Sequence, residues 1–223
     1  MLITNSPIRA LFLPINRTYI RTLGGAFVDF TLYKETELEQ WIYMKYRKNG
    51  FMNPSDLSDI DCIASAFGVD LVYCDHNSFS CNVSKVIFLN KTLDPIEQRD
   101  VFFHELCHVL RHAGDQRKMP KLFEQRQEME SGWFQNYAAM PFYMIETINL
   151  PETQREAVDV LAQEFRVSHK FAKERIHQIQ RRIFDSMLWE ENCKTLMPTK
   201  INENKWTPET LRILRQLQQQ FGG

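Results

Sequence analysis

The chain has 223 residues, 43% of them hydrophobic, and a net charge of −1. This composition supports a folded core and excludes a wholly disordered chain, while the balanced charge offers no overall attraction to nucleic acid or anionic lipid. No run of apolar residues is long enough to predict a membrane span. The odd number of cysteines, five, and an N-terminus without a secretory pattern lead us to expect reduced thiols and a cytoplasmic location.

The first half of the chain mixes helical and β patterns. Residues 1–33 show no clear period and stay unassigned. The spacing of apolar residues predicts a helix over residues 34–49 and a short helix over residues 59–67. Two β-rich runs, at residues 69–74 and 83–89, are separated by a polar loop and predict a hairpin or two neighbouring strands.

The second half is predicted to be helical. Asp94, Pro95 and Glu97 match the capping pattern of a helix that runs to about His112. Further helices are expected over residues 122–139, from about residues 151 and 168, and as an amphipathic helix over residues 207–221. Two helices, two strands and then helices to the end indicate an α+β fold rather than alternating βαβ units.

The most informative segment is His104-Glu105-Leu106-Cys107-His108, an H-E-x-x-H motif inside the predicted helix. Residues four apart lie one helical turn apart, so both imidazoles project to the same side and can share one ion. Neutral imidazole nitrogen is a preferred ligand of Zn²⁺. Glu105 then lies beside the ion, where its carboxylate can take a proton from water.

A catalytic zinc site needs a third protein ligand. His112 continues the row of histidines, but eight helical residues rise about 12 Å, so one ion cannot bind both His104 and His112. In the following helix, Glu124 and Glu128 share one face, whereas Glu130 lies about 200° round from Glu128. The shared face favours Glu128 as the third ligand and leaves Glu124 as the alternative.

Two stretches of the chain resemble the ImmA/IrrE metallopeptidases, particularly those of phages and integrative elements. Residues 103–114, which contain the H-E-x-x-H motif, resemble the metal-binding motif of that family. Residues 127–134, followed by Pro141, resemble its second motif, and in this register the family's third metal ligand falls on Glu128. The resemblance implies a zincin-like α+β metallopeptidase domain with a small antiparallel or mixed sheet and a helical C-terminal part.

The resemblance also implies the roles of the site residues and the kind of partner. His104, His108 and Glu128 would hold Zn²⁺, and Glu105 would be the general base of a zinc-dependent endopeptidase. The implied substrate is a protein, a helix-turn-helix repressor of a mobile element or a stress response, whose cleavage relieves repression. We expect the strand at residues 83–89 to be the sheet edge that aligns an extended substrate.

We expect three parts along the chain: an unassigned extension at 1–33, a zinc metallopeptidase domain at 34–150 and a helical region at 151–223. Residues 161–176 of the last region have the pattern of a helix-turn-helix. Residues 151–185 carry seven basic and six acidic side chains, too even a balance for a phosphate-binding surface. Direct binding of nucleic acid is therefore not expected, and the helices should pack on the peptidase or meet its substrate.

Two alternative functions stay open, and so does one role in the site. The chain could be a DNA-binding regulator with a structural zinc site, or a non-proteolytic anti-repressor that binds its target without cutting it. For the group that stabilises an oxyanion, the sequence offers Tyr137, Tyr143 and His76 and selects none of them.

Overall fold

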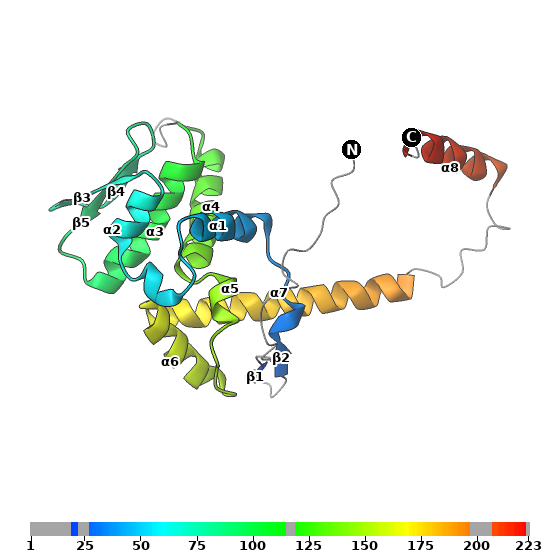
Figure 1. Ribbon diagram of the computed structural model, residues 1–223. Helices are drawn as coiled ribbons and strands as arrows, with labels where there is room; N and C mark the ends of the chain where they lie inside the picture. The colour runs from blue at the N-terminus through cyan, green and yellow to red at the C-terminus, as the bar shows by residue number, and fades with distance from the viewer. Residues whose placement is uncertain (1–18, 22–26, 115–118, 197–206, 222–223) are drawn as a thin grey trace. The chain divides into compact units, whose positions relative to one another are not determined.

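The computed structural model describes residues 19–21, 27–114, 119–196 and 207–221 (Figure 1). The chain divides into two compact units, residues 1–184 and residues 185–223. The elements in chain order are β1 (Tyr19–Arg21), β2 (Phe27–Asp29), η2 (Phe30–Leu32), α1 (Glu37–Lys48), η3 (Pro54–Leu57), α2 (Ile60–Ala66), β3 (Asp70–Cys74), β4 (Phe79–Cys81), β5 (Val86–Asn90), α3 (Pro95–Arg111), α4 (Lys121–Ala139), α5 (Phe142–Ile145), α6 (Gln154–Phe165), α7 (His169–Leu196) and α8 (Pro208–Phe221).

A three-stranded mixed sheet confirms the expected α+β fold class. Its strand order is β3-β5-β4, with β3 parallel and β4 antiparallel to β5. The two predicted β runs are neighbours, as expected, but they pair in parallel and do not form a hairpin. The expectation that the second run forms the sheet edge is wrong. It contains most of β5, which is the central strand because it pairs with β3 on one side and with β4 on the other, and its side chains Ile87 and Leu89 are fully buried in the core.

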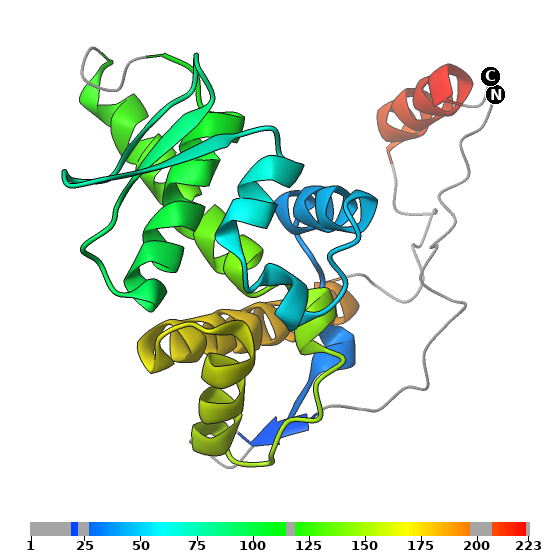
Figure 2. The same cartoon turned by 60° about the vertical axis from the view of Figure 1, so that its left-hand side comes forward.

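Helix α3 lies between the sheet and α4, since it contacts β4 and β5 as well as α4 (Figure 2). The predicted cap is confirmed: the Asp94 carboxylate accepts from the N–H groups of Ile96 and Glu97, and Glu97 bonds back to the Asp94 N–H. One face of α3 is anchored in the core by fully buried side chains, among them Phe102 and Leu106. The opposite side is left to carry the polar residues of the motif.

Part of the unassigned N-terminal extension takes part in the core. Strands β1 and β2 form an antiparallel pair, and η2 follows with Asp29 as its N-cap. Phe30 and Tyr33 are buried, and Tyr33 stacks on Phe142 with ring centroids 4.1 Å apart. Residues 1–18 and 22–26 of this extension lie outside the described residues.

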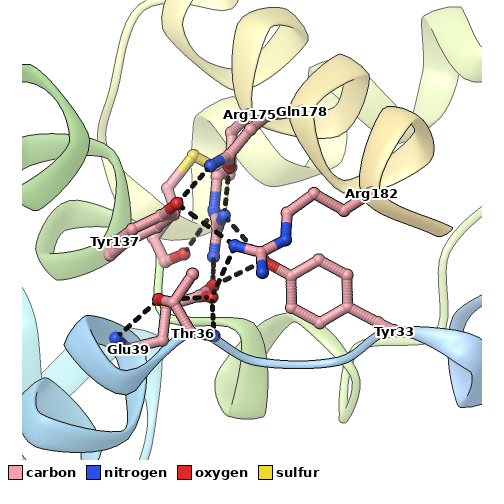
Figure 3. A network of polar contacts seen from close by, with 8 residues as sticks. Tyr33, Thr36, Glu39, Tyr137, Arg175, Gln178 and Arg182 are labelled. Atoms are coloured by element: carbon pink, nitrogen blue, oxygen red, sulfur yellow. Dashed lines mark hydrogen bonds and ion pairs between the residues drawn. The ribbon is translucent and has the colours of Figure 1, made fainter. Parts of the chain in front are cut away.

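A buried polar network joins α7 to α1 and to the end of α4 (Figure 3). Arg175 of α7 is fully buried, and its guanidinium donates to the Glu39 carboxylate over 2.8 Å and to the Met140 carbonyl over 3.1 Å. The Tyr33 hydroxyl donates to the same carboxylate over 2.6 Å, and Arg182 lies beside it. The network holds the first part of α7 inside the first unit.

The helix-turn-helix-like segment therefore packs in the same unit as the motif helix. Its apolar positions are buried, including Leu161, Phe165, Ala172 and Ile176. The expected border between residues 150 and 151 falls inside this unit. In the second unit, α8 forms where the last amphipathic helix is predicted. Among the described residues, no helix has the length and apolar character needed to cross a membrane.

Candidate metal centre

Three side chains from α3 and α4 converge on one point. His104 and His108 lie one turn apart on α3, and their Nε2 atoms are 3.2 Å apart. Glu128 of α4 places its two carboxylate oxygens 3.2 Å from His104 Nε2 and 3.4 Å from His108 Nε2. Among the described residues, these three form the group whose ligand atoms lie close enough together to hold a metal ion, and Glu124 is not part of it.

The spacing of this group fits a zinc ion. Tetrahedral zinc with bonds of about 2.0–2.1 Å requires ligand atoms about 3.3 Å apart. The two histidine nitrogens are 3.2 Å apart, and each lies 3.2–3.4 Å from one of the two Glu128 carboxylate oxygens. Burial and the neighbouring His104 lower the pKa of His108 to about 4, which keeps its imidazole in the neutral form that binds metals. Glu128 is 45% exposed, so the site opens to solvent on the α4 side.

Glu105 lies next to the candidate ligands and is held by a residue of the sheet. The Ser80 hydroxyl of β4 donates to Glu105 Oε2 over 2.6 Å. Burial raises the pKa of Glu105, although the Ser80 hydrogen bond and the nearby His104 act in the opposite direction. Ser80 was not foreseen, because it lies in a stretch that the sequence predicts as a polar loop.

Another residue that was not foreseen at the centre is Ser131. Its side chain is fully buried in α4, and its hydroxyl lies 3.2 Å from His108 Nε2. From the sequence alone it is a small residue on the face of α4 that meets α3, with nothing to indicate a polar contact.

His112 stands at the C-terminal cap of α3 and lies outside the metal-ligand group. Its Nδ1 is 2.9 Å from His108 Nδ1, on the side of that ring that faces away from Glu128. Its Nε2 is 3.5 Å from Glu130 Oε2, and Glu130 Oε1 accepts a hydrogen bond from Arg111 over 2.6 Å. Burial lowers the pKa of His112, which favours its neutral form.

The candidates for stabilising an oxyanion are not brought into the group. The Tyr137 hydroxyl accepts from Gln178 over 2.7 Å, and the Tyr143 hydroxyl donates to the Phe51 carbonyl over 2.7 Å. His76 lies exposed in the loop between β3 and β4. Each tyrosine hydroxyl is therefore hydrogen-bonded to a residue outside the candidate metal group.

Comparison with known proteins agrees with this fold. The Peptidase M78 family model, described as the IrrE N-terminal-like domain, matches residues 58–177. The Bacillus subtilis (strain 168) protein YqaB is 30% identical over 168 residues, covering 74% of this chain and 97% of YqaB. The phage-like element PBSX protein XkdA of the same strain is 32% identical over 149 residues, covering 66% of this chain and 75% of XkdA.

Among solved structures, a Mycobacterium tuberculosis transcriptional regulator matches with a TM-score of 0.46 and 15% identity. That match covers 62% of this chain and 46% of the regulator. The family model spans more than half of this chain, and the match to YqaB spans nearly all of that relative. The chain therefore belongs to the Peptidase M78 family, whose IrrE N-terminal-like domain it carries.

Proposed function

We propose that this chain is a zinc-dependent endopeptidase, with His104, His108 and Glu128 as zinc ligands and Glu105 as general base. The observation that carries the proposal is the convergence of the three ligand side chains at separations of 3.2–3.4 Å. Glu105 adds the second requirement of such a site, a carboxylate adjacent to the first ligand and oriented by its own hydrogen bond.

The catalytic steps follow from the position of Glu105. When bound, the zinc would polarise the scissile carbonyl and make water more acidic. Ser80 holds Glu105 through Oε2, and we assign Oε1 as the atom that takes the proton from the attacking water. The same carboxyl group then delivers the proton to the leaving amine. The upward shift in the pKa of Glu105 suits both steps, because the group must accept and later release a proton.

The strand β4 supports a way to align a substrate. It pairs with β5 on one side only and forms one edge of the three-stranded sheet. Ser80 of this strand contacts Glu105, so the edge runs beside the proposed base. An extended peptide could add to β4 through main-chain hydrogen bonds, which would bring its carbonyl groups past the metal ligands. This assignment replaces the expected edge at residues 83–89.

The resemblance to the ImmA/IrrE peptidases supports a helix-turn-helix repressor as the substrate, cut in the cytoplasm to relieve repression. The similarity to XkdA, which is named as a protein of a phage-like element, supports an origin in a mobile element. The DNA-binding alternative is disfavoured by Arg175: it lies in the helix-turn-helix-like segment but is fully buried against Glu39, where it cannot reach a phosphate.

The test is cleavage of a co-expressed candidate repressor by the wild-type chain and by Glu105→Gln, with zinc content measured in both. We expect the variant to keep its zinc and to lose about 10²–10⁴-fold in cleavage rate, the usual contribution of a general base. Glu124→Gln, which removes an exposed carboxylate from α4, is the matched control and should cleave normally. Normal cleavage by Glu105→Gln would refute the proposed base. Stoichiometric binding by the wild-type chain without cleavage would favour the anti-repressor alternative.

A further inference from the structure

A histidine and a carboxylate stand in series behind one of the proposed metal ligands. His108 directs Nε2 toward Glu128 and His104, while its other ring nitrogen, Nδ1, lies 2.9 Å from His112 Nδ1. The far nitrogen of His112 lies 3.5 Å from Glu130, and Arg111 donates to Glu130 over 2.6 Å. These contacts form a row that runs from the proposed ligand His108 through the His112 imidazole to the Glu130 carboxylate, which is paired with Arg111.

The hydrogen-bonding capacity of imidazole determines how such a row is protonated. A metal-binding imidazole offers the lone pair of one nitrogen to the ion and carries its proton on the other. If His108 binds through Nε2, its Nδ1 carries the proton and donates to His112 Nδ1. His112 must then carry its own proton on Nε2, which lies 3.5 Å from Glu130 Oε2 and 4.0 Å from Cys107 Sγ. Of these two neighbours the carboxylate oxygen is the stronger acceptor, so the row leads to Glu130.

We propose that His112 and Glu130 are positioning residues that hold the His108 ring in the orientation and tautomer required for metal binding. This inference rests on the proposed zinc site and adds a device that tunes its affinity. The His112 side chain is only 6% exposed, so its hydrogen bonds face little competition from water. Glu130 is in turn held by Arg111, which limits its freedom to turn away.

The row also joins the two helices that form the centre. His108 belongs to α3 and His112 is the C-cap of that helix, whereas Glu130 belongs to α4, two residues beyond the proposed ligand Glu128. Outer hydrogen-bond partners of this kind usually contribute about 10–100-fold to metal affinity. The same range is expected here, because removing His112 would leave the His108 N–H without its acceptor in a largely buried position.

The test is zinc affinity, measured on the full chain by competition with a chromogenic chelator. We expect His112→Phe to weaken zinc binding about 10–100-fold. His112→Asn keeps an oxygen that can accept from His108 and should recover much of that loss. Glu130→Gln keeps an acceptor without the charge and should give an intermediate value. Glu124→Gln, on the same helix but outside the row, should bind zinc like the wild-type chain.

Two further measurements separate positioning from a general effect on the fold. The zinc-free form of Glu130→Gln should stay folded at the assay temperature and keep the circular dichroism spectrum of the wild-type chain, although the loss of the charge paired with Arg111 lowers its melting temperature. Long-range ¹H–¹⁵N spectra of the zinc-loaded wild-type chain should show His112 neutral with its proton on Nε2, and His108 protonated on Nδ1. This assignment needs no variant, so it decides the question even if His112→Phe does not fold.

The outcomes distinguish this inference from the function on which it rests. If the wild-type chain binds no zinc, the proposed function and the positioning roles fall together. If it binds zinc but folded His112→Phe binds zinc equally well, or if His112 carries its proton on Nδ1, only the positioning roles are refuted.

Discussion

Replacing Arg175 by methionine tests the buried ion pair that joins α7 to α1. The Arg175 side chain is fully buried, and its guanidinium lies 2.8 Å from the Glu39 carboxylate, which is itself almost fully buried. Burial alone would raise the pKa of Glu39, but Arg175 and the hydrogen bonds from Thr36 and Tyr33 outweigh it and hold this pKa below 4.5. Glu39 is therefore ionised at neutral pH and depends on its partners.

The expected loss of folding stability in Arg175→Met depends on the partners that the Glu39 carboxylate keeps. Removing one member of a buried pair usually costs about 3–5 kcal/mol, since the other charge stays buried without compensation. Glu39 would still accept from the Tyr33 hydroxyl over 2.6 Å and from the Thr36 N–H over 2.9 Å, and Arg182 would remain 3.5 Å from its carboxylate. We therefore expect the lower end of that range, about 3 kcal/mol. In a unit of this size, that loss corresponds to a fall of about 6–12 °C in melting temperature.

Urea denaturation at pH 7 measures the loss, and a double variant provides the internal control. Arg175→Met combined with Glu39→Gln should regain at least about 1 kcal/mol over Arg175→Met alone, because the buried charge that has lost its nearest cation is gone. The lowered pKa of Glu39 means that the pair stabilises the wild-type fold above pH 4.5 and that this contribution is lost as the pH falls below it. In Arg175→Met, the free energy of unfolding should therefore fall less steeply as the pH drops below 4.5. An unfolding free energy within about 1 kcal/mol of wild type would refute the reasoning.

Three further predictions concern the pH dependence of folding stability, stabilisation by zinc and the residue that holds the proposed base. Burial raises the pKa of Asp100 from 3.8 to about 6, so folding stability should fall as the pH rises between those values. In urea denaturation across this pH range, Asp100→Asn should remove the slope and raise the free energy of unfolding by about 1–3 kcal/mol at pH 7. The control Asp70→Asn, at an exposed position, should do neither. In calorimetry, free zinc at about 1,000 times its Kd should stabilise the wild-type fold by about 4 kcal/mol, and adding a chelator should remove that stabilisation. The chelator should not change the stability of His104→Ala. Ser80→Ala should lower kcat about 10–100-fold at unchanged zinc content, because the hydrogen bond to Glu105 is lost; an unchanged kcat would contradict its role.

The parts of the fold that the sequence predicts well are those determined by neighbours along the chain. The cap formed by Asp94 and Glu97 involves residues three apart, and the structure confirms it. The alignment of His104 with His108 requires only one turn of helix, so a helical period is enough to expect it. The position of Glu128 beside the histidines could not be predicted from the helical period alone. Glu124 shares the same helix face and stayed an alternative third ligand until the family resemblance favoured Glu128.

The parts that escaped prediction depend on pairing between distant segments. β4 has only three residues inside a polar loop, and its strand character comes from hydrogen bonds to β5 rather than from its own composition. The position of Ser80 beside Glu105 follows from that pairing and has no signal in the sequence. Arg175 and Glu39 are 136 positions apart, and no local pattern indicates that they meet. The same non-local packing makes β5 central rather than an edge.

The packing of α3 against α4 explains why the candidate centre needs so few elements. α3 carries the two proposed histidine ligands and the proposed base, and His112 caps its C-terminus, while α4 supplies Glu128 to the metal group and Glu130 to His112. A shift of α4 along α3 would thus disturb the inner ligand and the outer carboxylate together. Because the Arg111–Glu130 ion pair ties the same two helices, it opposes that shift. The affinity of the proposed metal site is therefore coupled to the register between these two helices, whereas the Arg175 pair contributes to the stability of the unit as a whole.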